Sequence, residues 1–133
     1  MKSVIRKLLH ERIFDKKSEQ QIELLNKFVD FAAEFLGITN PKVILQFKRD
    51  GLVTTASYAG KVSHIYAKDR ALVDIMRSIG HELTHMKQDM HGELDKQPHD
   101  KNNEEGSPIE NEANAKAGVM IRKFGKMYPE IYE

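Results

Sequence analysis

The sequence predicts an α+β fold, a single domain over residues 1–133 with one core, in which helices precede and follow a small sheet along the chain. Three observations predict it. Apolar residues recur at helical spacing near both ends of the chain, while a central region is rich in β-branched residues and turn formers. The length of 133 residues, with 40% hydrophobic and 31% charged, suits one compact domain and is short for two.

Residues 1–38 are predicted to form two helices at the N-terminus. Apolar residues recur at helical spacing from Ser3 to Ile13, and again from about Ser18 to Leu36. Gly37 follows the second run, and glycine is common where a helix ends. We therefore expect the second helix to end there.

Residues 42–67 are predicted to form a small antiparallel three-stranded sheet. The segments VILQF, LVTTASYA and VSHIYA are rich in β-branched and aromatic residues, as strands are. Between them, residues 49–51 (Arg-Asp-Gly) and 60–61 (Gly-Lys) have the composition of turns. Three strands in succession with short turns predict a meander.

Residues 70–91 are predicted to form an amphipathic helix with Asp69 as its N-cap. Seven apolar residues fall on one side, which we expect to be buried: Leu72, Ile75, Met76, Ile79, Leu83, Met86 and Met90. At about 100° per residue, five polar residues lie within roughly 80° of one another on the opposite side: Asp74, Ser78, His81, His85 and Gln88.

Residues 92–107, GELDKQPHDKNNEEGS, are predicted to be an exposed loop because almost none of them is apolar. A last helix is predicted over residues 108–128. Ser107 suits its N-cap, and Pro108 suits its first position, where no backbone N–H is needed.

The composition limits the partners and the metal chemistry. With 21 Lys+Arg against 20 Asp+Glu, the formal charge of +1 gives no reason to expect nucleic acid as a partner. There is no cysteine, so a metal ion could be bound only by histidines and carboxylates. No stretch approaches transmembrane length, and the N-terminus does not look like a signal peptide. We expect a soluble, cytoplasmic protein without a membrane partner.

Residues 81–85 form the pattern H-E-x-x-H inside the predicted helix of residues 70–91. On a helix His81 and His85 lie one turn apart on one face, so both imidazoles can bind one ion at about 2.0–2.1 Å. Glu82 then projects beside them toward a metal-bound water. Because the periodicity predicts the helix independently of the motif, we interpret the two histidines as metal ligands and not as surface residues.

Two glutamates near the start of the last predicted helix are candidates for the third ligand that a zinc peptidase needs. The helical face of Glu110 is small and then apolar: Ala113, Asn114, Ala117 and Ile121. The face of Glu112 is more polar: Ala115, Lys116, Val119 and Lys123. The inward stripe favours Glu110. However, Ser107-x-x-Glu110 is also the pattern of a capping box, and if Glu110 only serves as a cap, Glu112 would be the ligand.

The two motifs resemble those of the gluzincin metallopeptidases, in which an H-E-x-x-H helix is followed by a helix with a glutamate ligand. HELTH and the later P-x-E-x-x-A-N carry the resemblance, which covers roughly residues 42–124. The order of strands, active helix and glutamate helix is similar to that of the minimal gluzincins and of small peptidases that act on phage repressors. The pattern H-E-x-x-H-x-x-Q, which ends at Gln88, also looks like several small zincin groups.

The resemblance implies a zincin-like fold and the activity of a zinc metalloendopeptidase. It implies that Zn²⁺ is bound by three side chains, His81, His85 and Glu110. It implies that Glu82 is the catalytic base, which takes a proton from the attacking water and passes it to the leaving amine. The position of Asn114 is one where the family often has a residue that supports a histidine.

The resemblance further implies that the last predicted strand, residues 62–67, is a sheet edge that pairs with an extended peptide or protein substrate. An alternative keeps the zincin fold and the metal but gives them a structural or interaction role with little or no peptidase activity. A third and weaker reading is a nucleic-acid-associated factor that uses the basic residues of the segment 1–17.

The residue that stabilises the oxyanion is not assigned by the resemblance, because this chain lacks the C-terminal subdomain of the large gluzincins. Four side chains are candidates, two at or beyond the end of the active helix and two near the C-terminus: His91, His99, Tyr128 and Tyr132. We interpret His64, which alternates with apolar residues on a predicted strand, as an ordinary half-exposed residue.

Overall fold

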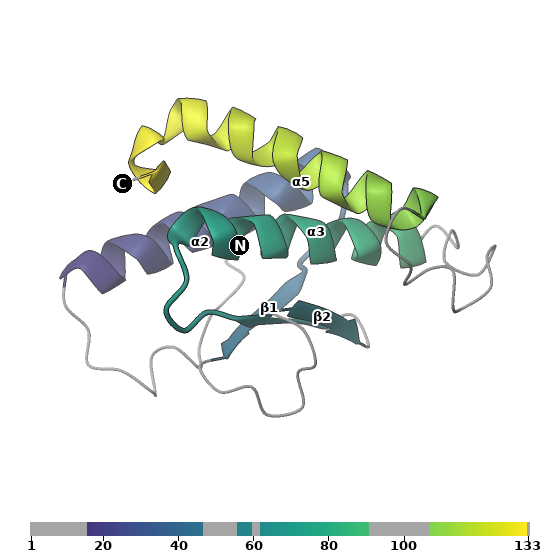
Figure 1. The fold of residues 1–133 in the computed structure, drawn as a ribbon, viewed down its shortest axis with the longest axis horizontal. Coiled ribbons are helices and arrows are strands. Elements are labelled where there is room, and N and C mark those ends of the chain that lie inside the picture. Colours follow the sequence, from purple (N-terminus) through teal and green to yellow (C-terminus); the bar gives the residue numbers. More distant parts are fainter. Residues whose placement is uncertain (1–15, 47–55, 60–61, 91–106, 133) are drawn as a thin grey trace.

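The computed structural model describes residues 16–46, 56–59, 62–90 and 107–132. Three long helices, α2 (Lys16–Leu36), α3 (Leu72–Met90) and α5 (Pro108–Met127), lie on one side of a small sheet, and α5 packs on the side of α3 that faces away from the strands (Figure 1). A 3-10 helix, η2 (Pro129–Tyr132), follows α5. The predicted helix over residues 3–13 and nearly all of the predicted loop over residues 92–107 lie outside the described residues.

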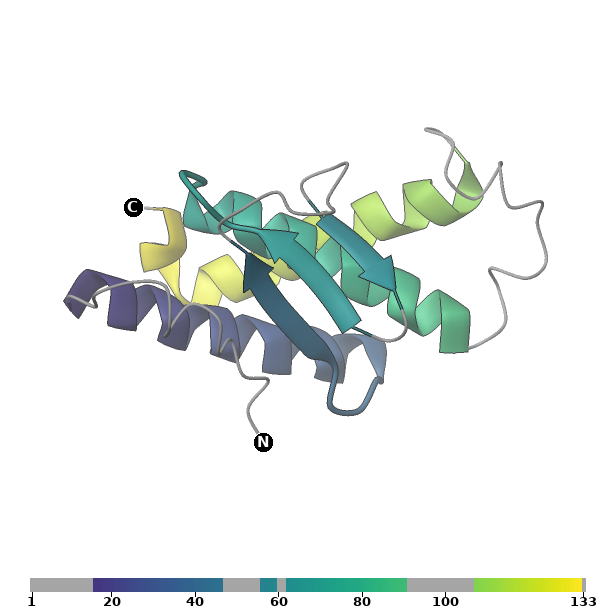
Figure 2. The same cartoon turned by 90° about the horizontal axis from the view of Figure 1, so that it is seen from below.

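The sheet is mixed, so the predicted antiparallel three-stranded sheet is wrong. The strand order is β1-β3-β2: β3 (Val62–Tyr66) is parallel to β1 (Lys42–Gln46) and antiparallel to β2 (Ala56–Ala59) (Figure 2). The turn residues between the first two strands suggested a hairpin, but these strands are not neighbours. Adjacency in sequence therefore did not dictate strand pairing here.

The prediction that the last strand is a sheet edge is also wrong, because β3 is the central strand. His64 of β3 is paired with Ile44 of β1 on one side and with Ser57 of β2 on the other. Both backbone edges of β3 are therefore occupied, and no peptide can pair with it. The expected zincin-like fold included that antiparallel sheet, and only the broader α+β class is compatible with helices on one side of a mixed sheet.

The C-terminal end of α2 confirms the role predicted for Gly37. This glycine has a φ of 74°, in the left-handed region where a side chain would be strained. The N–H of Ile38 donates to the carbonyl of Ala33 at 2.9 Å, and the N–H of Gly37 donates to that of Glu34 at 3.3 Å. These two bonds form a Schellman motif, which satisfies the last carbonyls of the helix and turns the chain toward β1.

The predicted buried stripe of α3 is confirmed except at its end. Six of its seven apolar residues are at most 9% exposed, whereas Met90 is 53% exposed. Met90 is the last residue of α3, and helical periodicity does not tell where a helix leaves the core. The start of the helix differs as well: α3 begins at Leu72, and Asp69 is not its N-cap but has a φ of 57° in the preceding turn. Aspartate tolerates this left-handed conformation better than most residues do.

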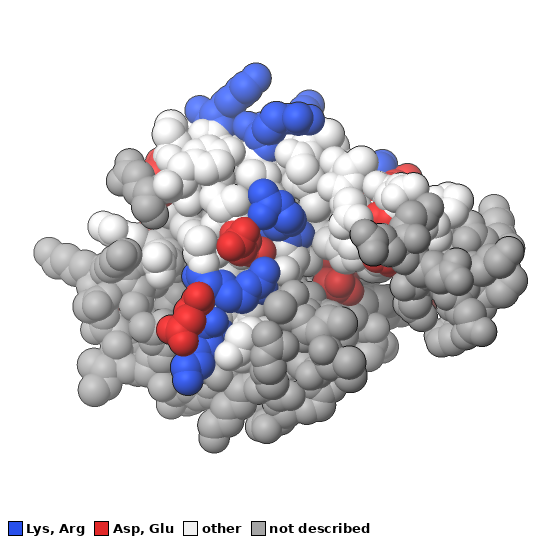
Figure 3. Space-filling view, viewed as in Figure 1, with Lys and Arg blue, Asp and Glu red and all other residues white. Residues whose placement is uncertain are grey.

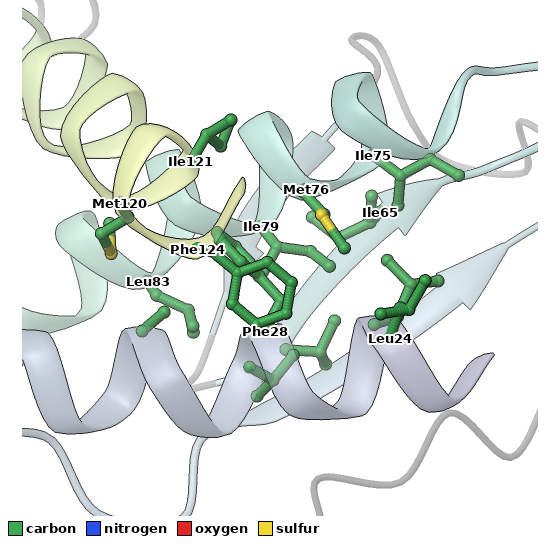
Figure 4. Close-up of a cluster of buried hydrophobic side chains, with 14 of the residues drawn as sticks. Leu24, Phe28, Ile65, Ile75, Met76, Ile79, Leu83, Met120, Ile121 and Phe124 are labelled. Carbon is green, nitrogen blue, oxygen red and sulfur yellow. The ribbon is translucent and has the colours of Figure 1, made fainter. Parts of the chain in front are cut away.

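The core fills the space among the three helices and extends to the inner face of the sheet (Figure 4). Phe28 of α2 and Phe124 of α5 meet edge to face with ring centroids 5.2 Å apart, and both are almost fully buried. From the sheet, Val43, Leu45 and Ile65 are buried in the same core. Edge-to-face aromatic pairs contribute about 0.5–1.5 kcal/mol beyond the burial of their surface. The core therefore fixes α5 relative to α2 and the sheet.

α3 and α5 approach each other closely at small residues. A Cβ atom added to Gly80 would lie 3.2 Å from the Cα of Ala117, so a side chain there would push against the backbone of α5. At the start of α5, Ser107 is the N-cap as predicted: its Oγ accepts a hydrogen bond from the N–H of Glu110 at 3.2 Å. Ser107 and Gly80 thus determine where α5 begins and how near it lies to α3.

Charged residues lie on the outer surface of the helices. Figure 3 shows basic side chains gathered along the upper edge of the molecule, over α5. Three exposed residues near the end of α5 are basic, Arg122, Lys123 and Lys126, and positive charge at this end suits the helix dipole. Within the described part of the chain, no helix combines the length and the apolar character needed to cross a membrane.

Candidate metal centre

Three side chains from two helices converge where the second half of α3 lies beside the first turn of α5. His81 and His85 come from α3, and Glu110 comes from α5. One ligand atom from each of the three lies within 4.8 Å of the other two, and all three residues are partly buried. The structure thus brings together the three residues predicted as ligands, in a group that could hold a metal ion.

The proton positions on the two imidazoles follow from their neighbours. His81 Nδ1 lies 2.8 Å from Asn114 Oδ1, and His85 Nδ1 lies 2.7 Å from Gln88 Oε1. Amide oxygens only accept hydrogen bonds, so in each neutral imidazole Nδ1 carries the proton and donates it. Each Nε2 atom then has a free lone pair. This is the tautomer that binds a metal through Nε2.

When both imidazoles are neutral and the carboxylate is ionised, the atoms that face one another in the cluster are all acceptors. His81 Nε2 lies 3.1 Å from His85 Nε2 and 3.2 Å from Glu110 Oε1, while His85 Nε2 lies 2.7 Å from Glu110 Oε2. Lone pairs at such distances repel each other unless a cation is shared among them. Bonds of about 2.0–2.1 Å to a tetrahedral ion would place ligand atoms about 3.3 Å apart. The chemistry and the spacing of the cluster both fit one metal ion.

Burial controls the charge states of Glu82 and His81. Glu82 is 7% exposed, and its Oε2 lies 3.9 Å from His81 Nε2. Burial raises the pKa of Glu82 to about 7, with attraction to His85 opposing the rise and repulsion from Glu110 adding to it. Burial lowers the pKa of His81, and repulsion from His85 lowers it further. Attraction to Glu110 and the hydrogen bonds with Asn114 and Glu110 act in the opposite direction but are smaller. The neutral imidazole that a metal requires is therefore favoured at His81.

The structure places Glu110, and not Glu112, at the histidines. The carboxylate of Glu112 instead accepts a hydrogen bond from Gln88 Nε2 at 2.8 Å and lies 3.8 Å from Lys116 Nζ. Only the Ser107 half of the capping box is seen: the backbone N–H of Glu110 donates to Ser107 Oγ, while the Glu110 carboxylate faces His81 and His85. The backbone of Glu110 therefore takes part in the cap of α5, and its side chain lies in the metal cluster.

The described candidates for the oxyanion role lie away from this cluster. Tyr128 packs on Phe124 with ring centroids 4.7 Å apart, at the far end of α5 from Glu110. Tyr132 follows in η2 and is 59% exposed. The 20 residues of α5 span about 30 Å, so neither tyrosine can reach a group bound at the histidines. His91 and His99 lie outside the described residues.

His64 also lies away from the cluster. It alternates on β3 with the buried residues Ser63 and Ile65, so its side chain is on the face of the sheet opposite the helices. Its Nδ1 atom lies 3.3 Å from Gln46 Nε2 of the neighbouring strand. The interpretation of His64 as a residue outside the site agrees with this position.

No family model, curated protein or solved structure matches this chain. The resemblance to the gluzincins therefore stays a prediction, and any function has to be argued from the geometry of the cluster itself.

The hydrogen bonds of Gln88 that link the ligand-bearing helices α3 and α5 were not predicted from the sequence. In the sequence, Gln88 is one of the polar residues on the helix face and ends the H-E-x-x-H-x-x-Q pattern, while Glu112 is the alternative to Glu110 as third ligand. In the structure Gln88 contacts His85, Glu112 and the carbonyl of Ile109. The spacing of three residues from His85 to Gln88 could have suggested the first contact. The other two cross between helices, and nothing in the local sequence indicates them.

Proposed function

We propose that this protein is a zinc-dependent metallopeptidase of the gluzincin type, with His81, His85 and Glu110 as metal ligands and Glu82 as the general base. The observation that supports it is the convergence of three acceptor atoms on one point with a buried carboxylate beside them. Two imidazoles and a carboxylate, with no thiolate, suit a transition metal such as zinc better than calcium or magnesium. Two histidines and one glutamate are the ligand set of known zinc peptidases.

Zinc, when bound, supplies a Lewis acid that polarises the scissile carbonyl and makes a nearby water more acidic. Side chains of the protein orient the ligands and transfer the proton. Asn114 and Gln88 hold the proton of each histidine on Nδ1, so that both Nε2 atoms point into the cluster. Glu82 takes a proton from the attacking water and passes it to the leaving amine, so that a peptide or protein substrate is cleaved. Because Glu82 is nearly buried, this proton does not exchange freely with solvent.

Metal analysis together with a protease assay tests this proposal. The wild-type chain should contain about one zinc, whereas His85→Ala and Glu110→Ala should each lose it, since two ligands hold zinc too weakly. Glu82→Gln should keep its zinc but cleave an unfolded protein about 10²–10⁴-fold more slowly, because the base is gone. Glu23→Gln, whose side chain is 67% exposed on α2, is the matched control and should change neither property.

Two results would contradict the proposal. The first is full chelator-sensitive cleavage by Glu82→Gln, which would remove Glu82 from the mechanism. The second is a stoichiometric metal in His85→Ala, which would place the metal elsewhere.

A second candidate function is a metal-binding protein in which the ion braces the fold without catalysis. The burial of Glu82 favours it, because a base that is 7% exposed offers little room for a large substrate. This candidate predicts zinc at one ion per chain, a large increase in stability on binding, and no cleavage of unfolded proteins by the wild type. The same metal analysis and protease assay distinguish the two candidates.

A further inference from the structure

We propose that Gln88 is a positioning residue that orients two of the metal ligands at once, one on each helix. This inference rests on the metal site of the proposed function and adds a residue to it. Gln88 is fully buried, with an exposed fraction of 0%. Its side-chain amide makes three contacts that leave little freedom: to His85, to the carbonyl of Ile109 and to the carboxylate of Glu112.

The first part of the argument concerns the orientation of the amide. Gln88 Nε2 has two protons, and it lies 3.0 Å from the carbonyl oxygen of Ile109 and 2.8 Å from Glu112 Oε1. Both partners only accept hydrogen bonds, so both protons are used and the amide cannot be flipped. Gln88 Oε1 must then face His85 Nδ1, which lies 2.7 Å away. The proton on Nδ1 and the free lone pair on Nε2 of His85 both follow from this orientation.

The second part concerns the helix that carries the third ligand. Ile109 and Glu112 are both in the first turns of α5, on either side of Glu110 in the sequence. By binding a backbone atom and a side chain there, Gln88 fixes that turn against α3. The carboxylate of Glu110 is consequently held beside the imidazole that the same amide orients, with Glu110 Oε2 2.7 Å from His85 Nε2.

Asn114 provides a comparison within the same site. It also accepts a hydrogen bond from a histidine, through Oδ1 at 2.8 Å from His81 Nδ1. However, Asn114 is exposed, so water can replace its oxygen when the side chain is removed. Gln88 is buried where water has no access. Loss of Gln88 should therefore weaken metal binding more than loss of Asn114.

Zinc affinity measured by competition with a chromophoric chelator tests the inference, with the full chain. Gln88→Met, which has a similar volume and no hydrogen bonds, should bind zinc about 10- to 100-fold more weakly, as expected for loss of a group that supports a metal ligand. Its cobalt-substituted form should show a d–d absorption spectrum different from that of the wild type, because Glu110 and His85 are no longer held in place. Asn114→Ala should lose less affinity than Gln88→Met.

Thr84→Val is the matched control for the loss of a buried polar group. Thr84 lies on the same helix, is fully buried, and donates through Oγ1 to the carbonyl of Gly80 at 2.8 Å. We expect Thr84→Val to lower the urea stability of the metal-free protein and to leave zinc affinity and the cobalt spectrum unchanged. If Gln88 is only a buried polar residue of the core, Gln88→Met and Thr84→Val will behave alike, and the inference is overturned.

A paired exchange gives a second test that holds even if Gln88→Met does not fold. Gln88→Glu keeps an acceptor for His85 but faces the carboxylate of Glu112 with a like charge, so zinc affinity should fall. Adding Glu112→Gln restores an amide donor for the new carboxylate and should recover part of the lost affinity, although the carbonyl of Ile109 still faces an acceptor. A double variant no better than Gln88→Glu alone would count against the inference.

The outcome for the wild type separates this inference from the proposed function. A wild-type chain that binds no zinc would overturn both. A wild type that binds zinc, with unchanged affinity in Gln88→Met, would overturn only the role of Gln88. A wild type that binds zinc and depends on Gln88, but cleaves no protein, would support the inference and overturn the peptidase proposal.

Discussion

Replacing Glu82 by glutamine in the metal-free protein should remove a loss of stability that accompanies rising pH. Burial raises the pKa of Glu82 from 4.5 to about 7. Between these values the folded protein keeps a proton that the unfolded chain has released, so its stability falls as the pH rises. The contribution of the protonated carboxyl is fully present below pH 4.5 and is lost as the pH rises through about 7.

The size of the effect follows from the shift. At about 1.36 kcal/mol per pKa unit, the rise from 4.5 to about 7 corresponds to about 3 kcal/mol. The unfolding free energy of Glu82→Gln minus that of the wild type should thus increase by about 3 kcal/mol between about pH 4 and about pH 8. The lowered pKa of His81 makes both proteins more stable as the pH rises, so taking the difference between them removes most of this contribution.

Urea unfolding followed by circular dichroism, with a chelator present, measures both proteins across this range. Saturating zinc provides the control, because a nearby divalent cation favours the ionised carboxylate and should flatten the pH dependence of the difference. A difference in unfolding free energy that stays constant with pH in the chelated proteins would refute the reasoning.

Glycine substitutions test the contact between the helices and the end of α2. Gly118→Ala should raise the unfolding free energy by about 0.5–1 kcal/mol through helix propensity, since its Cβ would meet nothing within 4 Å. Gly80→Ala gains the same helix propensity but should not stabilise the protein, because its Cβ would press on Ala117 and move α5. It should weaken zinc binding for the same reason. Equal stabilisation by Gly118→Ala and Gly80→Ala would disprove this contact. Gly37→Ala should cost about 1–2 kcal/mol in thermal or urea unfolding, given its φ of 74°, and a neutral result would argue against that conformation.

The parts of the candidate site that could be predicted are those encoded within one helix. The spacing of His81 and His85 and the buried stripe of α3 repeat with the helical period, so the sequence alone places both histidines on one face. The choice of Glu110 over Glu112 also followed from helical faces, and the structure brings the side chain of Glu110 to the histidines. The contact of Gln88 with Glu112 was not predictable, because it depends on how two helices are docked.

The arrangement of the strands also depends on contacts between distant segments, and it was predicted less well than the site. The composition of β1, β2 and β3 identified three strands, yet their order depends on which backbone edges meet after the chain has passed through residues 47–55. Alternation of buried and exposed residues along β3 is the same whether its neighbours run parallel or antiparallel. Strand pairing is therefore a property of the whole domain. No residue within the three strands distinguishes the mixed sheet from the predicted antiparallel one.

The placement of Phe124 and Glu110 on one helix has a consequence for the thermodynamics of metal capture. Fourteen positions separate them, about 21 Å along α5. The packing of Phe124 on Phe28 therefore holds one end of this helix in the core, and the carboxylate of Glu110 lies near the other end. Folding of the core has already placed that carboxylate beside the histidines before any ion binds. The loss of conformational entropy is therefore part of folding and not of metal binding, which is the basis of a chelate effect. A substitution deep in the aromatic core is thus a route to tuning the affinity for an ion without altering a single ligand.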